Sequence, residues 1–205
     1  MGRVLTIGAS ATGRNRRLAH EGEYLRRVAI EIVFETHSTT EDNERGIATG
    51  WLPGRLSDAG RAEARALGLR RRDNDIDAIF TSDLGRAVET AAIAFGETEI
   101  PILADWRLRE CDYGERNGTP VAWFRGHRAE YIDQGYPGGE SWSEAAVRVG
   151  RFLQDVPLRW EGRRIVVIGH TATRWALEHL LEGTPLADLV DADFGWQEGW
   201  EYVLP

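Results

Sequence analysis

Lysine is missing from this sequence, and cysteine is nearly so. All 25 basic residues are arginine, so the chain offers no lysine nucleophile and no lysine of a phosphate-binding loop. The single cysteine, Cys111, cannot form an intramolecular disulfide or a thiolate-based metal centre, which fits a reducing compartment. Any fixed positive side-chain charge in a binding site must therefore come from arginine.

Long apolar runs and a positive net charge are also absent. No window approaches the roughly 18 consecutive apolar residues of a membrane span, and the N-terminus lacks the apolar stretch of about 7 to 15 residues found in signal peptides. The formal net charge of -8 disfavours binding to nucleic acid or to an anionic membrane. The sequence thus predicts a soluble, cytoplasmic protein that has neither partner.

The chain divides into an N-terminal extension and one domain. Residues 1–27 carry six arginines against two glutamates and show no sustained hydrophobic period. We expect this extension to be a flexible tail rather than a targeting or regulatory arm. Residues 28–205, in a chain with 42% hydrophobic residues, suffice for a single core. The use of arginine in place of lysine suggests a bacterial genome rich in guanine and cytosine.

Strands and helices are expected to alternate along this domain. Short β-branched runs predict strands and amphipathic runs predict helices, with Ser57, Ser82 and a capping box from Ser141 to Glu144 at three helix starts. The alternation predicts an α/β fold, a three-layer α/β/α sandwich around a mainly parallel sheet. The expected strands are 30–35, 76–80, 100–103, 164–170 and 200–204, and the expected helices are 57–72, 82–96, one near 119–133, one from Ser141, and 171–183.

Three polar residues follow the expected strands. His37 comes directly after the first strand, Arg86 lies a few residues beyond the second, and His170 ends the strand at 164–170. In such folds ligands bind outside the carboxyl ends of the strands, so we expect these side chains at one rim. Taken singly, a histidine after a strand can be a helix cap, a metal ligand or a catalyst, and an arginine on a helix usually forms an ion pair. The roles of these three residues therefore have to be inferred from the sequence motifs around them.

Six short motifs occur in order between residues 36 and 171. Together they resemble the histidine phosphatase superfamily, in its phosphoglycerate mutase-like branch, and their order and spacing argue against a chance match. The resemblance implies the α/β/α fold of that family and phosphoryl transfer through a phosphohistidine. The motifs are T-H-S-T-T-x-x-N at 36–43, L-S-D-A-G-R-A-E-A at 56–64, S-D-L-G-R-A-V-E-T-A at 82–91, L-R-E-C-D-Y-G-E-R-N-G at 108–118, P-G-G-E-S at 137–141 and I-G-H-T at 168–171.

The resemblance assigns roles to four residues. His37 would be the nucleophile, and His170 and Arg86 would bind the transferred phosphoryl group. Glu110 would protonate the leaving oxygen and then take a proton from the attacking water. These residue types suit the chemistry, because neutral imidazole can attack phosphorus and a planar guanidinium contacts two phosphate oxygens. Neither a metal ion nor an organic cofactor is expected. In the alternative structural interpretation, Glu110 merely pairs with a neighbouring arginine.

The family signature Arg-His-Gly at the nucleophile is altered to Thr36-His37-Ser38. The missing guanidinium would contact the phosphate, and such a charge-assisted hydrogen bond contributes about 1.5 to 3 kcal/mol, or ten- to a hundredfold in binding. We expect Arg174, near the start of the last helix, to replace it, and the arginines at 45 and 55 are alternatives. The expected substrate-binding residues are Asn43, Thr36, Ser38, Thr171 and Arg174.

The altered motif leaves more than one function open. The preferred one is a metal-independent phosphatase that acts on a small phosphorylated metabolite, and the alternative is a phosphate-binding protein without turnover. Retention of Glu110 favours the enzyme, because a binding protein does not need an acid beside the ester oxygen. A phosphoglycerate mutase-type enzyme would need more positive charge, yet the segment between Gly118 and Ser141 is short and holds only two arginines.

Aromatic residues bear on the substrate and on assembly. Segments 96–107 and 119–140 are expected to form the pocket rim, and their aromatic side chains suggest a ring-bearing or sugar phosphate. Most of the eight tryptophans, and Cys111, are expected in the core. The C-terminal stretch at 194–205 predicts either a core strand or a strand of a homodimer. The histidines without a motif, expected to be structural or at the surface, are His20, His127 and His179.

Overall fold

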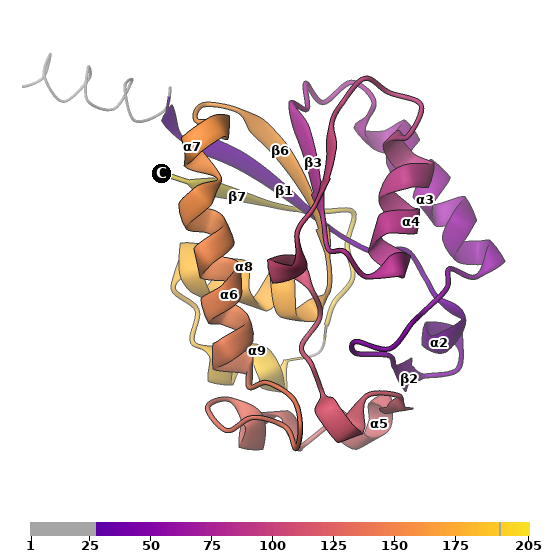
Figure 1. The fold of residues 1–205 in the computed structure, drawn as a ribbon, viewed down its shortest axis with the longest axis vertical. Helices are drawn as coiled ribbons and strands as arrows, with labels where there is room; N and C mark the ends of the chain where they lie inside the picture. The colour runs from indigo at the N-terminus through magenta and orange to yellow at the C-terminus, as the bar shows by residue number, and fades with distance from the viewer. Residues whose placement is uncertain (1–27, 193) are drawn as a thin grey trace, which may run out of the picture.

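The computed structural model describes residues 28–192 and 194–205 (Figure 1). The predicted N-terminal extension, residues 1–27 with His20, lies outside the described residues. Across the described ranges, none of the helices has both the length and the apolar character that a membrane crossing requires.

A five-stranded sheet forms the centre of the domain, in the strand order β4-β3-β6-β1-β7 (Figure 1). β1 and β6 are parallel, as are β3 and its neighbours β6 and β4, whereas β7 runs antiparallel to β1 at the sheet edge. The five predicted strands and the mainly parallel sheet are thereby confirmed, and the C-terminal strand pairs within its own chain. The strands are β1 (Ile30–Thr36), β3 (Ala78–Thr81), β4 (Ile102–Ala104), β6 (Arg164–Gly169) and β7 (Trp200–Leu204).

The carboxyl ends of the three central strands are aligned. In the register of β3 and β6, Thr81 lies opposite Ile168. The backbone N–H of His37 donates to the carbonyl of Gly169 at 2.9 Å, and that of Ser82 donates to the carbonyl of Ile168 at 3.1 Å. The chain segments that follow β1, β3 and β6 therefore start from one edge of the sheet, where ligands of α/β proteins bind.

Helices cover both faces of the sheet and produce three layers (Figure 1). Val33 of β1 belongs to the core beneath α3 and α4, with Leu67 and Ala91, whereas Phe34 belongs to the core beneath α6 and α8, with Phe152. Because both faces of the sheet are covered here, β1 is apolar at the three consecutive positions 32–34. The helices are α3 (Asp58–Arg71), α4 (Gly85–Phe95), α6 (Trp142–Asp155), α7 (Pro157–Trp160), α8 (Thr171–Glu182) and α9 (Leu186–Asp191).

The predicted signals at three helix ends are confirmed. Ser57 is the N-cap of α3, and Ser141 with Glu144 forms the capping box of α6. Such a cap typically contributes about 1 kcal/mol by satisfying backbone donors that the first helical turn leaves free. α8 ends at Gly183, whose φ of 79° is the left-handed conformation that glycine adopts without strain.

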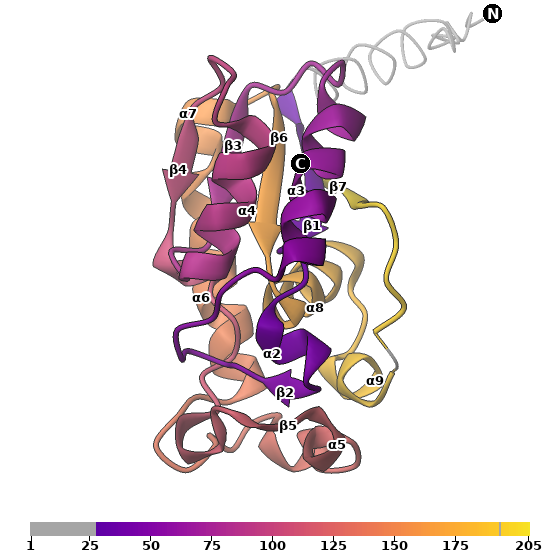
Figure 2. The ribbon, with the colours of Figure 1, turned by 90° about the vertical axis from the view of Figure 1, so that its right-hand side faces the viewer.

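A small subdomain lies beyond the carboxyl end of the sheet (Figure 2). It contains the two-stranded sheet of β2 and β5 and a cluster of aromatic rings. The ring centroids of Tyr113 and Phe124 are 4.5 Å apart, and those of Trp142 and Trp175 are 4.8 Å apart. Both of these tryptophans are buried, but Trp106 and Trp196 are exposed and the other four are half-buried, so the prediction that most tryptophans lie in the core is wrong. The short elements here are α2 (Glu41–Glu44), β2 (Ile47–Ala48), η1 (Trp106–Leu108), η2 (Gly114–Arg116), β5 (Thr119–Pro120), α5 (Val121–Phe124) and η3 (Arg128–Tyr131).

Two predicted helical features are wrong. α4 begins at Gly85 and has Leu84 as its N-cap, so Ser82 does not cap it. The stretch at 119–133 forms only α5 and the 3-10 turn η3, because Gly126, with a φ of 81°, interrupts the helical path between them.

Candidate active site

His37 stands at the end of β1, and the backbone fixes the orientation of its ring. Its Nδ1 lies 2.8 Å from the carbonyl oxygen of Ser38. Because a carbonyl oxygen can only accept, Nδ1 carries the proton and Nε2 carries the lone pair. The Nε of Arg86 donates to this Nε2 at 3.3 Å. His37 is thus a neutral imidazole whose nucleophilic nitrogen faces a guanidinium.

Arg86 connects the two predicted histidines. It lies in the first turn of α4, is only 3% exposed, and donates from Nη2 to the carbonyl of Gly50 at 2.9 Å. Nη2 is also 3.3 Å from Nδ1 of His170, which must accept because a guanidinium has only donors. Nε2 of His170 then carries the proton and donates to Oγ of Ser82 at 2.8 Å. One buried guanidinium therefore holds both imidazole rings, whose centroids are 5.0 Å apart.

Burial and the charge of Arg86 keep both imidazoles neutral. These two causes lower the pKa of His37 to about 3, although its hydrogen bond to Ser38 acts in the opposite direction. They also hold the pKa of His170 well below its ordinary value, and His37 adds to the effect. Burial lowers the pKa of Arg86 as well, partly offset by Glu110, but an arginine stays protonated at neutral pH. An anion that enters this site meets a permanent cation between two neutral rings.

Glu110 is held by the backbone on two sides. Its Oε1 accepts the N–H of Cys111 at 2.9 Å and that of Ala172, in the first turn of α8, at 3.0 Å. Oε1 is thereby committed, which leaves Oε2 as the oxygen that can serve a ligand. Cys111 is buried, as predicted. The neighbouring Arg107 and Arg109 form ion pairs with aspartates, so the structural alternative for Glu110 is wrong.

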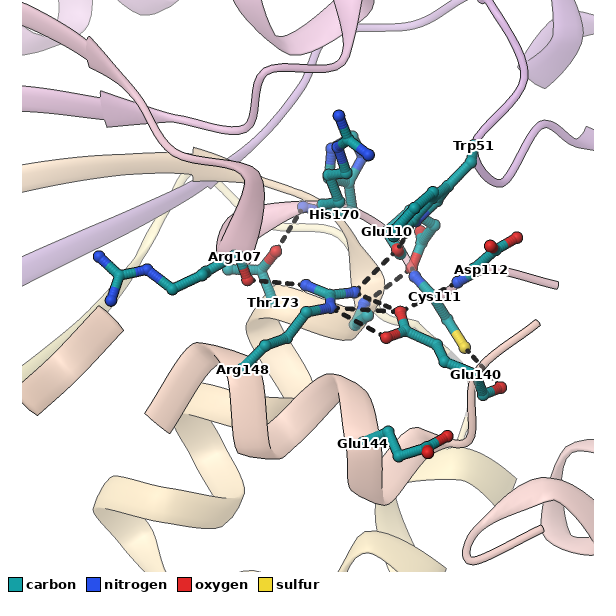
Figure 3. A network of polar contacts seen from close by, with 12 residues as sticks. Trp51, Arg107, Glu110, Cys111, Asp112, Glu140, Glu144, Arg148, His170 and Thr173 are labelled. Carbon is teal, nitrogen blue, oxygen red and sulfur yellow. Dashed lines mark hydrogen bonds and ion pairs between the residues drawn. The ribbon is translucent and has the colours of Figure 1, made fainter. Parts of the chain in front are cut away.

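The main chain at Glu110 is fixed as well (Figure 3). Its carbonyl oxygen accepts the indole N–H of Trp51 at 2.6 Å and Nη2 of Arg148 at 2.9 Å. Arg148 is 4% exposed and is compensated by an ion pair with Glu140 at 2.6 Å. The sequence motifs assign no role to Trp51 or Arg148, although Glu140 lies in the P-G-G-E-S motif. These contacts position the carboxylate of Glu110 without touching a ligand.

A cavity of about 540 Å³ opens over these residues. Its wall combines the end of β1, parts of α2, α3 and α8, and the segment 194–198. The predicted site residues that the structure brings together in this wall are Thr36, His37, Ser38, Asn43, Glu110, His170 and Thr171. Arg86 joins them through its contact with His37.

Asn43 is oriented by the capping box of α2. Its Oδ1 accepts hydrogen bonds from the backbone N–H of Thr40 at 3.0 Å and from the hydroxyl of Thr40 at 2.8 Å. The amide oxygen is therefore occupied, and the two amide hydrogens of Asn43 remain as donors at the cavity. This arrangement agrees with the substrate-binding role expected of Asn43.

The arginine expected to compensate for Thr36 lies elsewhere. The guanidinium of Arg174 pairs with Glu178 at 3.2 Å and lies over the rings of Trp200 at 4.7 Å and Phe194 at 5.0 Å. It touches the cavity wall only through Phe194 and does not line the cavity itself. The guanidinium that does line the cavity belongs to Arg70 of α3, which bonds Glu35 at 3.1 Å. Sequence reasoning missed Arg70, although its helical spacing from Glu63 and Leu67 puts the three residues on one face, and that face lines the cavity.

The predicted pocket rim is also wrong. Phe124 is buried in the subdomain core, and Trp123 stacks on His127 with ring centroids 4.6 Å apart. These rings pack on one another beneath the site because the expected helix does not form. The outer wall of the cavity is provided instead by Phe194, Trp196 and Glu198, which precede the edge strand β7.

Neutral imidazoles around a buried guanidinium, at the carboxyl end of the mainly parallel sheet of an α/β protein, form a site that is suited to an anion. Comparison with known proteins makes the class more specific, because residues 32–195 match the model of the histidine phosphatase superfamily (branch 1). The chain belongs to this superfamily, as the sequence motifs indicated.

Relatives of this chain include mutases and phosphatases. The chain is 35% identical over 180 residues to a 2,3-bisphosphoglycerate-dependent phosphoglycerate mutase of Methylobacterium radiotolerans, a match that covers 78% of this chain and 82% of the relative. The solved structure of Bacillus stearothermophilus YhfR superposes with a TM-score of 0.72 at 28% identity, covering 82% of this chain and 88% of that one. A mycobacterial glucosyl-3-phosphoglycerate phosphatase, in complex with VO3, gives a TM-score of 0.69 at 25% identity, covering 80% and 86%.

Proposed function

We propose that this protein is a metal-independent phosphatase that hydrolyses a small phosphate monoester through a phosphohistidine on His37. The observation that carries the proposal is the shared guanidinium. Arg86 contacts the lone-pair nitrogen of His37 and the ring of His170, in a cavity that also contains Glu110. A nucleophile, a charged phosphate contact and an acid are therefore gathered at one place, which is what phosphoryl transfer requires.

The reaction follows from these positions in two steps. In the first, Nε2 of His37 attacks phosphorus while Arg86 exchanges its contact with that nitrogen for the phosphoryl oxygens. The bond from phosphorus to the ester oxygen breaks, and Glu110 gives its proton to the departing oxygen. In the second, Glu110 takes a proton from water, the oxygen of that water attacks phosphorus, and the bond to His37 breaks to release inorganic phosphate.

A phosphoglycerate mutase-type activity is the second candidate, since the curated relative with 35% identity is named as one. Such an enzyme must hold a second anionic group of its substrate. The carboxylates of Glu35, Glu63 and Glu198 line the cavity beside a single cavity-lining arginine, Arg70. Arg70 lies close to Glu35 and Glu198, whereas Glu63 has no arginine partner in the described ranges. The negative charge of Glu63 opposes a second phosphate group, so the lining favours hydrolysis.

The test of the function is phosphate release from a panel of small phosphate monoesters in the presence of EDTA. We expect each ester consumed to yield one free phosphate, because water is the acceptor of the phosphohistidine. Stimulation by 2,3-bisphosphoglycerate, with the phosphoryl group retained on an organic product, would instead establish a mutase. Binding of the esters without release would identify a phosphate-binding protein.

The neutral state of the histidines predicts a dependence of stability on pH. The folded pKa of His37, about 3, lies below the usual value, so the unfolded chain binds the extra proton first. The stability that the neutral ring contributes is therefore present above about pH 6.5 and is lost as the pH falls towards the folded pKa. Between about pH 7 and pH 5, urea unfolding should show a larger loss of stability for the native protein than for His37→Gln. Equal losses would contradict the pKa shift.

Restoring the family arginine should strengthen phosphate binding. Thr36 lines the cavity directly before His37, so Thr36→Arg places a guanidinium where the family motif has one. We expect the dissociation constant for inorganic phosphate, measured by calorimetry, to fall about tenfold or more. Arg174→Gln is the matched control and should leave this constant nearly unchanged, because Arg174 pairs with Glu178. If Arg174→Gln instead weakened phosphate binding about tenfold, roughly the effect of losing one charge-assisted hydrogen bond, Arg174 would be shown to replace the missing arginine.

A further inference from the structure

The outer part of the cavity, away from the histidines, is built from a carboxylate and aromatic rings. Glu63 comes from α3, and Phe194 and Trp196 come from the segment before β7. Trp196 is 64% exposed, although a ring of this size normally stabilises a protein by being buried. We define Glu63, Phe194 and Trp196 as the outer wall. An exposed indole in a cavity wall is available to a ligand.

Glu63 is held in place without being neutralised. Its Oε2 accepts the backbone N–H of Thr39 at 2.9 Å, and its Oε1 accepts the hydroxyl of Thr39 at 3.0 Å. Thr39 follows His37 by two residues, so this contact fixes the carboxylate beside the loop of the candidate nucleophile. Both donors are uncharged, and none of the basic residues in the described ranges forms an ion pair with Glu63. The charge of Glu63 is thus left for a ligand.

The other carboxylates of the cavity differ in this respect. Glu35 is 3% exposed and is bonded by Arg71 at 2.7 Å and by Arg70 at 3.1 Å, so two guanidinium groups compensate it. Glu198 lies 3.9 Å from Arg70. Glu63 is therefore the carboxylate best placed to select the charge of a substrate.

The segment that carries the aromatic rings is anchored to the domain. Arg71 donates to the backbone carbonyl of Glu198 at 3.0 Å. Gly199, with a φ of 86°, packs so closely on this arginine that an added Cβ would lie 2.0 Å from Nη2 of Arg71. Phe194 packs on Trp200 with ring centroids 5.7 Å apart, so the segment is held to the domain on both sides of Trp196.

We propose that the substrate carries a cationic group, an ammonium or quaternary ammonium, in addition to its phosphate. This inference rests on the proposed phosphatase function, since it places the phosphate at His37 and the cation at the outer wall. The carboxylate of Glu63 attracts the positive charge, and the exposed ring of Trp196 adds cation–π attraction. Phe194 contributes apolar contact only, because the guanidinium of Arg174 already lies over its ring, 5.0 Å from the centroid. An anionic group at the same position would meet the charge of Glu63. The substrate class is a small phosphate monoester of an amino alcohol or an amino sugar.

The test uses pairs of esters that differ in charge but not in shape. Phosphocholine is compared with 3,3-dimethylbutyl phosphate, and glucosamine 6-phosphate with glucose 6-phosphate, so that two spacings between phosphate and cation are covered. In at least one pair we expect kcat/KM to be about tenfold or more higher for the cationic ester, the effect of one charge-assisted contact. Glu63→Gln should remove most of this preference through KM, with the neutral ester nearly unaffected. Glu97→Gln, at an exposed position after α4, is the matched control and should keep the preference.

The outcomes separate this inference from the proposed function. Hydrolysis of both members of each pair at equal kcat/KM, unchanged in Glu63→Gln, would overturn the cationic substrate and leave the phosphatase intact. If no ester is hydrolysed, the phosphatase proposal fails, and the inference is then decided by calorimetric dissociation constants for the same four esters. A preference for the cationic members that depends on Glu63 supports it, and equal constants overturn it.

Discussion

Replacing His37 with alanine is expected to lower kcat/KM for phosphate monoesters by about a thousandfold or more, because the variant lacks the proposed nucleophile. The lone pair of Nε2 is directed at the guanidinium of Arg86, the group that would hold the phosphate in line with it. Loss of the ring removes the nucleophile but leaves Arg86 bonded to Gly50 and His170. Phosphate release from the ester panel, measured with equal amounts of native and variant protein, checks this result.

Two controls show whether the loss of activity in His37→Ala is due to the missing nucleophile alone. Inorganic phosphate should still bind the variant, since the remaining contacts of Arg86 keep the cation in place. His179→Ala serves as the matched histidine variant, because Nδ1 of His179 contacts the backbone carbonyl of Thr184 at 2.8 Å, outside the cavity wall. Its turnover should equal that of the native protein. Turnover by His37→Ala within about tenfold of native would show that a different group attacks phosphorus.

Replacing Glu110 with glutamine should produce a loss that depends on the leaving group. The amide oxygen can still accept the N–H groups of Cys111 and Ala172, so the position of the side chain is kept. The proton donor is gone, and hydrolysis of alkyl phosphates should fall by about 10² to 10⁴, the usual contribution of a general acid or base. p-Nitrophenyl phosphate departs without a proton, so its first step should be much less affected.

The second step gives this variant a distinct signature. Water attack on the phosphohistidine also needs Glu110, as base, so Glu110→Gln should release a rapid burst of nitrophenol, one per protein molecule, followed by slow turnover. Stopped-flow absorbance measures the burst. Equal losses for alkyl and nitrophenyl esters, without a burst, would mean that Glu110 only supports the structure of the site.

The sheet and the meeting of the two histidines could be predicted because they depend on local patterns. The buried run at 30–35 and the run at 164–170 each predict a strand, and parallel strands bring their carboxyl ends to one edge. The residues that follow, His37 and His170, then meet without any knowledge of the side-chain packing. The strand IPIL at 100–103 and the C-terminal strand are also short local runs rich in apolar residues.

The remaining parts of the site depend on tertiary contacts that no local pattern encodes. Ser82 follows a strand and precedes a helix, as an N-cap would, but its hydroxyl bonds His170, which is 88 residues away in the sequence. Arg70 is an ordinary helix residue until the cavity forms beside α3. The outer wall comes from the segment before β7, and its place is set by the pairing of β7 with β1 rather than by its own sequence.

The altered motif at Thr36 leaves fewer free positive charges near the proposed phosphate site. Where the family has an arginine before the nucleophile, this chain has Thr36, and the neighbouring positive charges of Arg70 and Arg71 are bound to Glu35. The phosphate site therefore depends on Arg86 to a greater extent than a site with two free arginines would. A second, cationic group on the substrate would recover binding energy at the outer wall that the phosphate contacts no longer supply.

The most direct test of the account is to identify the covalent intermediate. Glu110→Gln is mixed rapidly with p-nitrophenyl phosphate, stopped in alkaline denaturant, in which phosphohistidine survives, and digested for mass spectrometry. We expect the peptide that contains His37 to gain the mass of one phosphoryl group, with fragmentation that places the group on the imidazole. Release of nitrophenol without a phosphorylated peptide, or with the phosphoryl group on another residue, would contradict a phosphohistidine mechanism at His37.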